Sequence, residues 1–300
     1  MKPGIYLVHK PVGHTSFSLV QAFMDEVRLA GIRRDKLPVC HGGALDPFAS
    51  GLLLLLAGQA TRLMDLLHGA PKTYIAEISW GAETDNGDLL GAITATASPL
   101  RLTPDLLDTA LRPFVGWHDQ VPPAHSNKRV AGERAYLRAH RGESFALPPS
   151  RVYLHEARFL EHDLPRRSTL RLVTGGGYYV RALARDLGRA TSALAHLGAL
   201  RRIAIGPWED PGAEGARVHV GGAALFPWLP SLQIAAGDLA ALREGRDLPL
   251  RPPAPPSWPL PAGFPDPGAP VRALLGGNLV ALLRERDRRW VAAPALKSPL

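Results

Sequence analysis

The sequence predicts a protein of mixed α and β structure. Residues 72–81, K-T-Y-I-A-E-I-S-W-G, alternate apolar and polar side chains, which is the pattern of a strand with one buried face. Residues 180–190 instead carry apolar side chains at helical spacing. The 300 residues are 46% hydrophobic, enough for one large core or two modest ones. Both kinds of element can therefore be buried.

The chain opens with a short buried strand, because residues 4–8 form an apolar run bounded by glycine and lysine. A turn follows and ends in Thr15 or Ser16, either of which is placed to cap a helix over residues 17–30. Residues 28–37 gather charge without periodicity, and this pattern predicts a loop.

The chain is organised around the segment from Val39 to Leu56, whose centre is Asp46. Small residues flank that carboxylate, Pro47 stiffens the turn after it, and the leucine run that follows can only be core. A polar group on a glycine-lined approach, backed by a buried segment, is typical of a site held out to a ligand. The alternative is that Asp-Pro starts a turn and Asp46 only caps it.

Residues 81–88 predict a polar turn, residues 91–97 a strand, and residues 103–114 a helix that Thr103 begins. A basic region follows over residues 121–151. Its charged residues include Lys128, Arg129, Arg134, Arg138, Arg141 and Arg151, against Glu133 and Glu143. A solvated helical face and a contact with RNA or DNA both fit this excess, and the overall charge favours nucleic acid.

Two further strands are expected over residues 152–159 and 168–174. The second runs into G-G-G-Y-Y-V-R, which ends at Arg181. Strand, glycine cluster and helix also outline a nucleotide-binding loop, but the G-x-G-x-x-G spacing is absent and no Gly-Lys-Ser/Thr follows. The cluster instead suits a backbone that a bulky group approaches closely, with Arg181 aimed at an anion. A strand-end turn with an exposed arginine is the alternative.

The composition changes after Gly206. Residues 238–244 predict a short helix, and residues 248–270 are dominated by proline and are not expected to pair as a sheet or to form a helix. Candidate strands of a small terminal β module follow over residues 272–275, 279–283 and 290–292.

Composition also bounds the classes of function. The 35 Lys and Arg against 27 Asp and Glu give a net charge of +8, which indicates a polyanionic partner. The single cysteine, Cys40, excludes an intrachain disulfide framework and a cysteine-cluster metal site. The N-terminus predicts neither a signal peptide nor an anchor, and no apolar run approaches membrane-spanning length. We therefore expect a cytoplasmic protein.

Several motifs follow one another along the chain. They are K-P-x-G-x-T-S-F, H-G-G-A-L-D-P-F-A-S-G-L-L, K-T-Y followed by T-D-N-G-D, G-G-Y-Y-V-R-A-L-A-R-D-L-G, and L-R-R-I-A-I-G-P-W. Together, over about Gly4 to Trp208, they resemble the TruB family of tRNA pseudouridine synthases. Any one of these motifs would be weak, but their coincidence is specific. The chain departs from the family's pattern at Gly43, Tyr178 and Asn86, none of which is assigned to the chemistry.

The resemblance implies the conversion of uridine to pseudouridine at position 55, in the T loop of transfer RNA. It assigns Asp46 as the catalytic aspartate, Tyr74 as the tyrosine that stacks on the base, and Arg181 as the partner of the aspartate. His41, with Gly42 beside it, matches the family's H-x-G segment, which contacts the T-loop RNA. Further matches near the site or its support are Lys10, Lys128, Tyr179 and Leu200.

This chemistry suits these residue types. Breaking the bond at the anomeric carbon develops positive charge on the sugar, and a carboxylate such as Asp46 can either add to that carbon or stabilise the charge. A nearby Arg181 would keep the carboxylate ionised. Stacking on Tyr74 could hold the detached base with roughly 1–3 kcal/mol. The base must first be flipped out of the loop, and neither a metal nor an organic cofactor is called for.

For the architecture, the resemblance implies an α+β pseudouridine synthase catalytic domain with a large mixed, mainly antiparallel sheet over residues 1–230. A small C-terminal β domain, PUA-like and RNA-binding, is expected over residues 231–300 and includes the proline-rich insert. Nothing requires more than a monomer. The alternatives are a related synthase acting on another RNA, a non-catalytic RNA chaperone or binding protein, and a glycoside hydrolase that would release free uracil.

Overall fold

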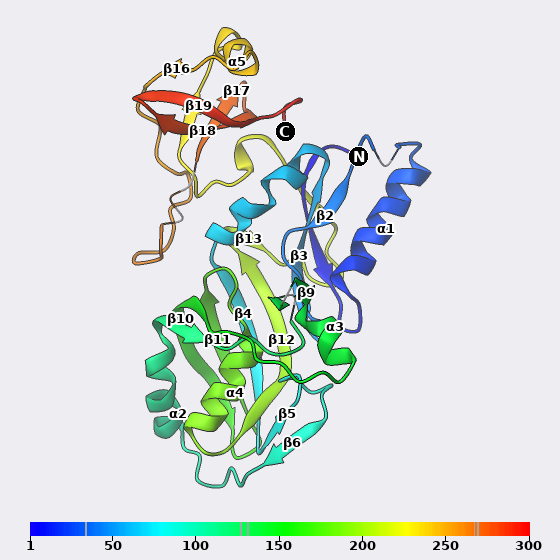
Figure 1. Ribbon diagram of the computed structural model, residues 1–300, viewed down its shortest axis with the longest axis vertical. Helices are drawn as coiled ribbons and strands as arrows, with labels where there is room; N and C mark the ends of the chain where they lie inside the picture. Colours follow the sequence, from blue (N-terminus) through cyan, green and yellow to red (C-terminus); the bar gives the residue numbers. More distant parts are fainter. Residues whose placement is uncertain (34, 127, 131, 267, 269) are drawn as a thin grey trace. The chain divides into compact units, whose positions relative to one another are not determined.

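The computed structural model describes residues 1–33, 35–126, 128–130, 132–266, 268 and 270–300 (Figure 1). The chain forms two compact units. The first comprises Met1–Pro47, Gly51–Pro71 and Ala204–Leu300, and the second comprises Phe48–Ser50 and Lys72–Ile203. The two ends of the chain thus belong to one compact unit, and the domain boundary predicted at residue 230 stays a prediction.

The first unit contains an antiparallel group of strands in the order β14 (Val218–Val220), β1 (Gly4–Lys10), β3 (Ser50–Ala57) and β2 (Val39–His41). Its helices are α1 (Ser16–Leu29), α5 (Ala236–Arg243) and the 3-10 helices η1 (Gly58–Gly69) and η3 (Gly222–Ala224). Short strand β13 (Trp208–Glu209) pairs with the end of β12 (Ala195–Ile205).

The leucine run of β3 is continuous because both faces of that strand are covered. Leu52, Leu54 and Leu56 pack in a core cluster that includes residues of η1. Leu53 and Leu55 point the other way and pack in a second cluster against α1. A strand buried on both faces has no polar side to alternate with, and this segment is core, as predicted.

The second unit is built on strands in the order β12, β4 (Lys72–Trp80), β11 (Arg167–Thr174), β10 (Ser150–Asp163) and β7 (Gly116–Gln120). The pairs from β4 to β7 are antiparallel. Helices α2 (Pro104–Leu111) and α4 (Val180–Ala190) contact each other; in Figure 1 α4 is drawn across these strands and α2 beside them. The smaller elements are the hairpins β5 (Ala82–Thr84) with β6 (Ile93–Thr96) and β8 (Arg129–Val130) with β9 (Glu133–Arg134), and the helices η2 (Arg112–Phe114) and α3 (Ala135–His140).

A separate five-stranded sheet forms near the C-terminus, in the order β15 (Ser231–Gln233), β17 (Val271–Leu275), β18 (Asn278–Arg286), β19 (Arg289–Ala295) and β16 (Leu248–Pro249). The predicted small terminal β module is confirmed. Buried Arg272 supports it by donating hydrogen bonds to the carbonyls of Ala223, Leu225 and Leu229.

Three expectations need correction. The proline-rich stretch does enter a sheet, because Leu248 and Pro249 pair with β19 as its edge strand, where a residue without an N–H is tolerated. The polar turn at residues 81–88 begins with the strand β5. The basic region is helical only in α3, which is six residues long; its residues 127 and 131 lie outside the described part of the chain.

Candidate active site

Asp46 lies in irregular backbone between β2 and β3 and is half-buried. The backbone of Pro47, the residue after Asp46, is held by hydrogen bonds from the N-terminal segment. The Pro47 carbonyl accepts a hydrogen bond from the Gly13 N–H at 2.8 Å and one from the Lys10 ammonium at 3.4 Å. The same ammonium donates to the Pro11 carbonyl at 2.9 Å. Lys10, which is fully buried, is therefore brought to the Asp46 segment as a support for its backbone.

His41 ends β2, and Gly42 follows it as a buried residue. The Gly42 N–H donates to the Leu54 carbonyl at 2.8 Å. A Cβ on Gly42 would run into the side chains of Leu67 and Leu56. This close packing explains why a residue without a side chain stands at position 42. The RNA contact predicted for His41 and Gly42 stays a prediction.

Tyr74 and Leu200 lie on the neighbouring strands β4 and β12 of the second unit. Tyr74 is opposite Leu172 of β11 and is only 9% exposed, and Leu200 is 7% exposed. The alternation seen in the sequence is thus realised, since Tyr74, Ala76, Ile78 and Trp80 are all buried. The sequence did not predict β12, which runs without a break through Gly198.

Arg181 occupies the first turn of α4 and is 5% exposed. Its guanidinium donates to the Asn86 carbonyl at 2.7 Å and to the His125 carbonyl at 2.9 Å. One of its nitrogens lies 3.9 Å from a carboxylate oxygen of Asp88. The alternative prediction, that Arg181 is an exposed arginine in a strand-end turn, is therefore wrong. Buried guanidinium groups need several acceptors, and this one has them.

Asp88 is a residue that sequence reasoning missed, although it closes the quoted T-D-N-G-D turn. It is 4% exposed, and its Oδ1 accepts from the Asn86 side chain and the Leu90 N–H, each at 2.9 Å. The Thr84 hydroxyl donates to the Asp88 carbonyl at 2.8 Å. These bonds leave Oδ2 facing Arg181. The turn therefore presents one carbonyl and one carboxylate to that guanidinium.

Tyr179 precedes α4, and its backbone is held by the side chain of Gln120, a second residue that the sequence did not single out. Lys128 is exposed and leads into the β8–β9 hairpin. The structure thus places Tyr179 and Arg181 at one helix start and places Lys128 at the surface.

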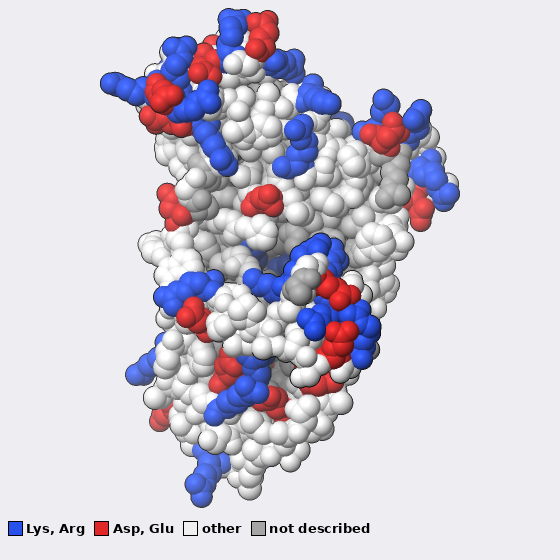
Figure 2. Space-filling view, viewed as in Figure 1, with Lys and Arg blue, Asp and Glu red and all other residues white. Residues whose placement is uncertain are grey.

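The arginines of the basic region are partly neutralised within it. Arg141 pairs with Glu133 at 2.7 Å and with Glu143 at 2.6 Å, and Arg138 pairs with Glu143 at 2.7 Å. Figure 2 shows this interleaving of positive and negative side chains around α3. The positive charge that this region can offer to a polyanion is therefore smaller than the sequence suggests.

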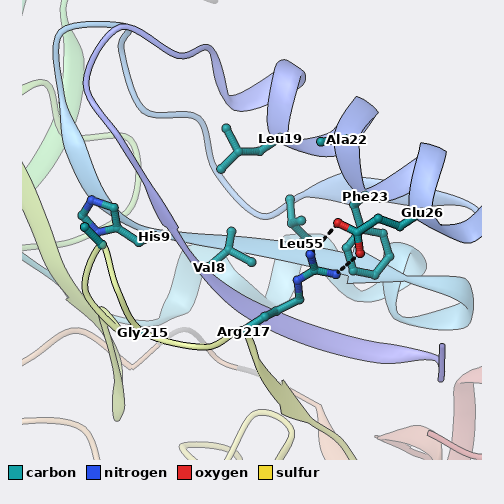
Figure 3. Close-up of a pocket in the computed structure, with 10 residues that line it drawn as sticks. Val8, His9, Leu19, Ala22, Phe23, Glu26, Leu55, Gly215 and Arg217 are labelled. Carbon is teal, nitrogen blue, oxygen red and sulfur yellow. Dashed lines mark hydrogen bonds and ion pairs between the residues drawn. The ribbon is translucent and has the colours of Figure 1, made fainter.

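A hollow of about 270 Å³ lies in the first unit between α1, β1 and the segment before β14 (Figure 3). Beside it, the His9 Nδ1 lies 2.9 Å from a carboxylate oxygen of Asp210. Two hydrogen bonds from Arg217 to Glu26 cross its rim, at 2.9 and 2.8 Å, and lower the pKa of that carboxyl. The hollow is lined by none of the predicted site residues.

Among the described residues, no group of three or more His, Cys, Asp and Glu side chains could hold a metal ion. Within that same part of the chain, no helix has the length and apolar character needed to cross a membrane.

Comparison with known proteins identifies the family to which this chain belongs. The family model described as "TruB family pseudouridylate synthase (N terminal domain)" matches residues 32–180. The tRNA pseudouridine synthase B of Rhodopseudomonas palustris is 39% identical over 270 residues, covering 83% of this chain and 70% of the relative. That of Parabacteroides distasonis is 38% identical over 202 residues, covering 67% of this chain and 85% of the relative.

Among solved structures, a chain of a Cbf5-Nop10-Gar1 complex aligns with a TM-score of 0.65 at 21% identity, covering 98% of this chain and 84% of that one. A chain of an archaeal box H/ACA sRNP Nop10-Cbf5 complex aligns with a TM-score of 0.62 at 20% identity, covering 98% and 85%. The α+β fold is that of a pseudouridine synthase, with a separate small C-terminal β sheet. Within that class, the chain belongs to the TruB family.

Proposed function

We propose that this chain is a tRNA pseudouridine synthase that isomerises uridine to pseudouridine at position 55, in the T loop of transfer RNA. One observation carries the proposal: relatives named tRNA pseudouridine synthase B match it at 38–39% identity across most of their length. Three of the motifs that resemble this family fall on the Asp46 loop, on β4 and at the start of α4. The enzyme is an isomerase, since substrate and product contain the same atoms: the proton lost from carbon five is balanced by one taken up at N1.

Asp46 is the proposed catalytic carboxylate. In the isomerisation the bond from the ribose C1′ to uracil N1 breaks, a bond from C1′ to C5 forms, the C5 proton passes to solvent, and N1 takes up a proton. The developing positive charge at C1′ needs a carboxylate that attacks it or stabilises it. The half-buried place of Asp46, on backbone fixed through Pro47, supports a group aimed at one reacting atom.

Tyr74 and Arg181 are the proposed supporting groups. A ring on a strand holds its position better than one on a loop, and stacking on such a ring would keep the detached uracil within reach of the sugar. Arg181 would keep the aspartate ionised and oriented. Arg181 is buried at the start of α4, and its guanidinium donates to two backbone carbonyls. These contacts support a fixed guanidinium rather than a mobile one at the surface.

The substrate is proposed to be the T-stem loop, from which the base must be turned out before it reacts. His41, Gly42 and Lys128 are proposed RNA contacts, together with Tyr179 and Leu200 near the site. The small C-terminal sheet is proposed to be a PUA-like RNA-binding module. We further propose that the protein works as a monomer in the cytoplasm, where it meets its tRNA.

A tritium-release assay tests the proposal. A T-stem-loop transcript labelled with tritium at uracil C5 is incubated with the native protein, with Asp46→Asn, and with Asp65→Asn as a matched control from the exposed surface of η1. We expect release by the native and control proteins and a loss of more than about 1,000-fold in Asp46→Asn. Absence of release by the native protein, with the RNA still bound, would overturn the enzymatic proposal.

The same assay separates the alternatives. A synthase for another RNA would release tritium only from other transcripts. An RNA chaperone would remodel its RNA equally well with Asp46→Asn, and a glycoside hydrolase would liberate free uracil, which chromatography detects. Formation of pseudouridine in the intact transcript is the outcome that the proposal requires.

A further inference from the structure

Ser16 connects the first turn of α1 to the residue before Asp46. Its hydroxyl oxygen accepts a hydrogen bond from the Leu45 N–H at 2.8 Å, and the hydroxyl donates to the Leu45 carbonyl at 3.2 Å. Ser16 is 4% exposed and Leu45 is 6% exposed, so water competes little for these bonds. One buried hydroxyl therefore serves both backbone polar groups of the residue that precedes Asp46.

Ser16 is not needed as the helix cap, although the sequence left Thr15 and Ser16 as equal candidates. Thr15 is the N-cap, because its side chain accepts from the Ser18 N–H at 3.0 Å. The Ser18 hydroxyl donates to the Thr15 carbonyl at 2.7 Å. The cap is complete without Ser16. The Ser16 hydroxyl instead forms its hydrogen bonds with Leu45.

Leu45 depends on such a partner. It lies between β2 and β3 and belongs to neither strand, so no sheet ladder serves its N–H and carbonyl. Buried backbone groups must nevertheless be paired. The Leu45 carbonyl is part of the planar peptide that joins Leu45 to Asp46. A hydrogen bond that fixes this carbonyl therefore also fixes the direction in which the Asp46 backbone begins.

The peptide on the other side of Asp46 is held by the same N-terminal segment. The Pro47 carbonyl accepts from the Gly13 N–H and from the Lys10 ammonium. Gly13 has a φ of +84°, a left-handed conformation that favours glycine. The K-P-x-G-x-T-S segment thus forms hydrogen bonds with the backbone immediately before and immediately after Asp46. None of these bonds involves the Asp46 carboxylate.

We propose that Ser16 is a positioning residue for Asp46. Its hydroxyl holds the Leu45–Asp46 peptide, and this peptide aims the carboxylate at the sugar carbon. The inference rests on the proposed function, because it takes Asp46 as the group that performs the chemistry. Misplacement of a reacting group by about 1 Å can cost about 100-fold in rate, so removal of this hydrogen-bonded pair acts on kcat and leaves RNA binding in place.

Tritium release at saturating T-stem-loop RNA tests the proposal. Ser16→Ala removes both bonds, and we expect kcat to fall at least about tenfold while KM stays within about twofold. Ser18→Ala is the matched control: the same change, in the same turn of α1, at a hydroxyl bonded to Thr15 and not to Leu45. We expect the control to keep the native kcat.

A second variant guards against loss of folding. Ser16→Cys keeps the size of the side chain but is a weak donor and acceptor, so the fold is retained and kcat again falls. Circular dichroism and the Kd for RNA confirm a folded, binding protein. If Ser16→Ala and Ser16→Cys fold and keep the native kcat, the inference is overturned. If the native protein itself releases no tritium, or Asp46→Asn remains active, the fault lies in the proposed function instead.

Discussion

The side chain of Gln120 and the backbone of Tyr179 exchange two hydrogen bonds. The Gln120 amide donates to the Tyr179 carbonyl at 3.0 Å, and its oxygen accepts from the Tyr179 N–H at 2.9 Å. Gln120 ends β7, is 2% exposed, and is 59 residues away in the sequence. Tyr179 is the N-cap of α4, and Arg181 follows two residues later. The glutamine therefore sets where the helix that carries Arg181 begins.

Gln120→Leu is expected to lower both stability and activity. It removes the bond that Gln120 makes to the Tyr179 N–H and one of the bonds to the Tyr179 carbonyl, which also accepts from the Leu183 N–H at 3.2 Å. A buried polar group that loses its hydrogen bond costs about 1–3 kcal/mol. Urea denaturation should show a lower midpoint. Tritium release should show a reduced kcat, because the start of α4 is no longer held in place and Arg181 moves with it. Gln233→Leu, at an exposed position in β15, should change neither. An unaltered midpoint in Gln120→Leu would contradict this account.

The basic region should contribute to RNA binding mainly through its exposed cations. Lys128→Glu with Arg134→Glu is expected to weaken RNA affinity and to flatten its dependence on salt, by about 0.7–0.9 in log–log slope for each phosphate that the variant no longer neutralises. Arg141→Gln should change that slope less, because Arg141 already pairs with two glutamates. Filter binding between low and moderate salt measures the slopes. Equal slopes for the native protein and the double variant would speak against a role of these two cations in binding RNA.

Lys72 should make stability depend on pH. Burial of its ammonium, assisted by the positive charge of Arg202, lowers the pKa of Lys72 from 10.5 to about 7. Between about pH 7 and 10.5 the unfolded chain then holds a proton that the folded chain lacks, so the free energy of unfolding rises with pH, by up to about 1.4 kcal/mol per pH unit. Below about pH 7 both forms are protonated and the contribution is constant.

Urea unfolding at several pH values between about 6.5 and about 9, most of them inside that window, compares the native protein with Lys72→Met. The stability difference, native minus variant, should increase with pH. Lys36→Met, at an exposed position, serves as the control and should show a flat difference. A flat difference for Lys72→Met as well would mean that the folded protein keeps this lysine charged throughout.

Much of the fold could be predicted from the sequence because it depends on near neighbours. The alternation that predicted a strand over residues 72–81 yields β4, and the helical spacing over residues 180–190 yields α4 at the same bounds. β12 was missed because its burial does not alternate regularly and because it contains Gly198, a residue that is disfavoured inside strands. A Cβ at that glycine would come within 2.5 Å of the Ser79 hydroxyl and 2.8 Å of the Glu77 carboxylate. Only the neighbouring strand explains that residue.

The sequence by itself determined the order of the motifs, and with it the family, as well as the identity of Asp46, Tyr74 and Arg181 as candidates. Only the tertiary structure decided what holds them. Ser16 reaches Leu45 across 29 residues, and Gln120 reaches Tyr179 across 59. Periodicity reports which face of an element is buried, because that depends on positions a few residues apart. A hydrogen bond between distant residues has no period, and it exists only once the chain has folded and brought a buried donor to a buried acceptor.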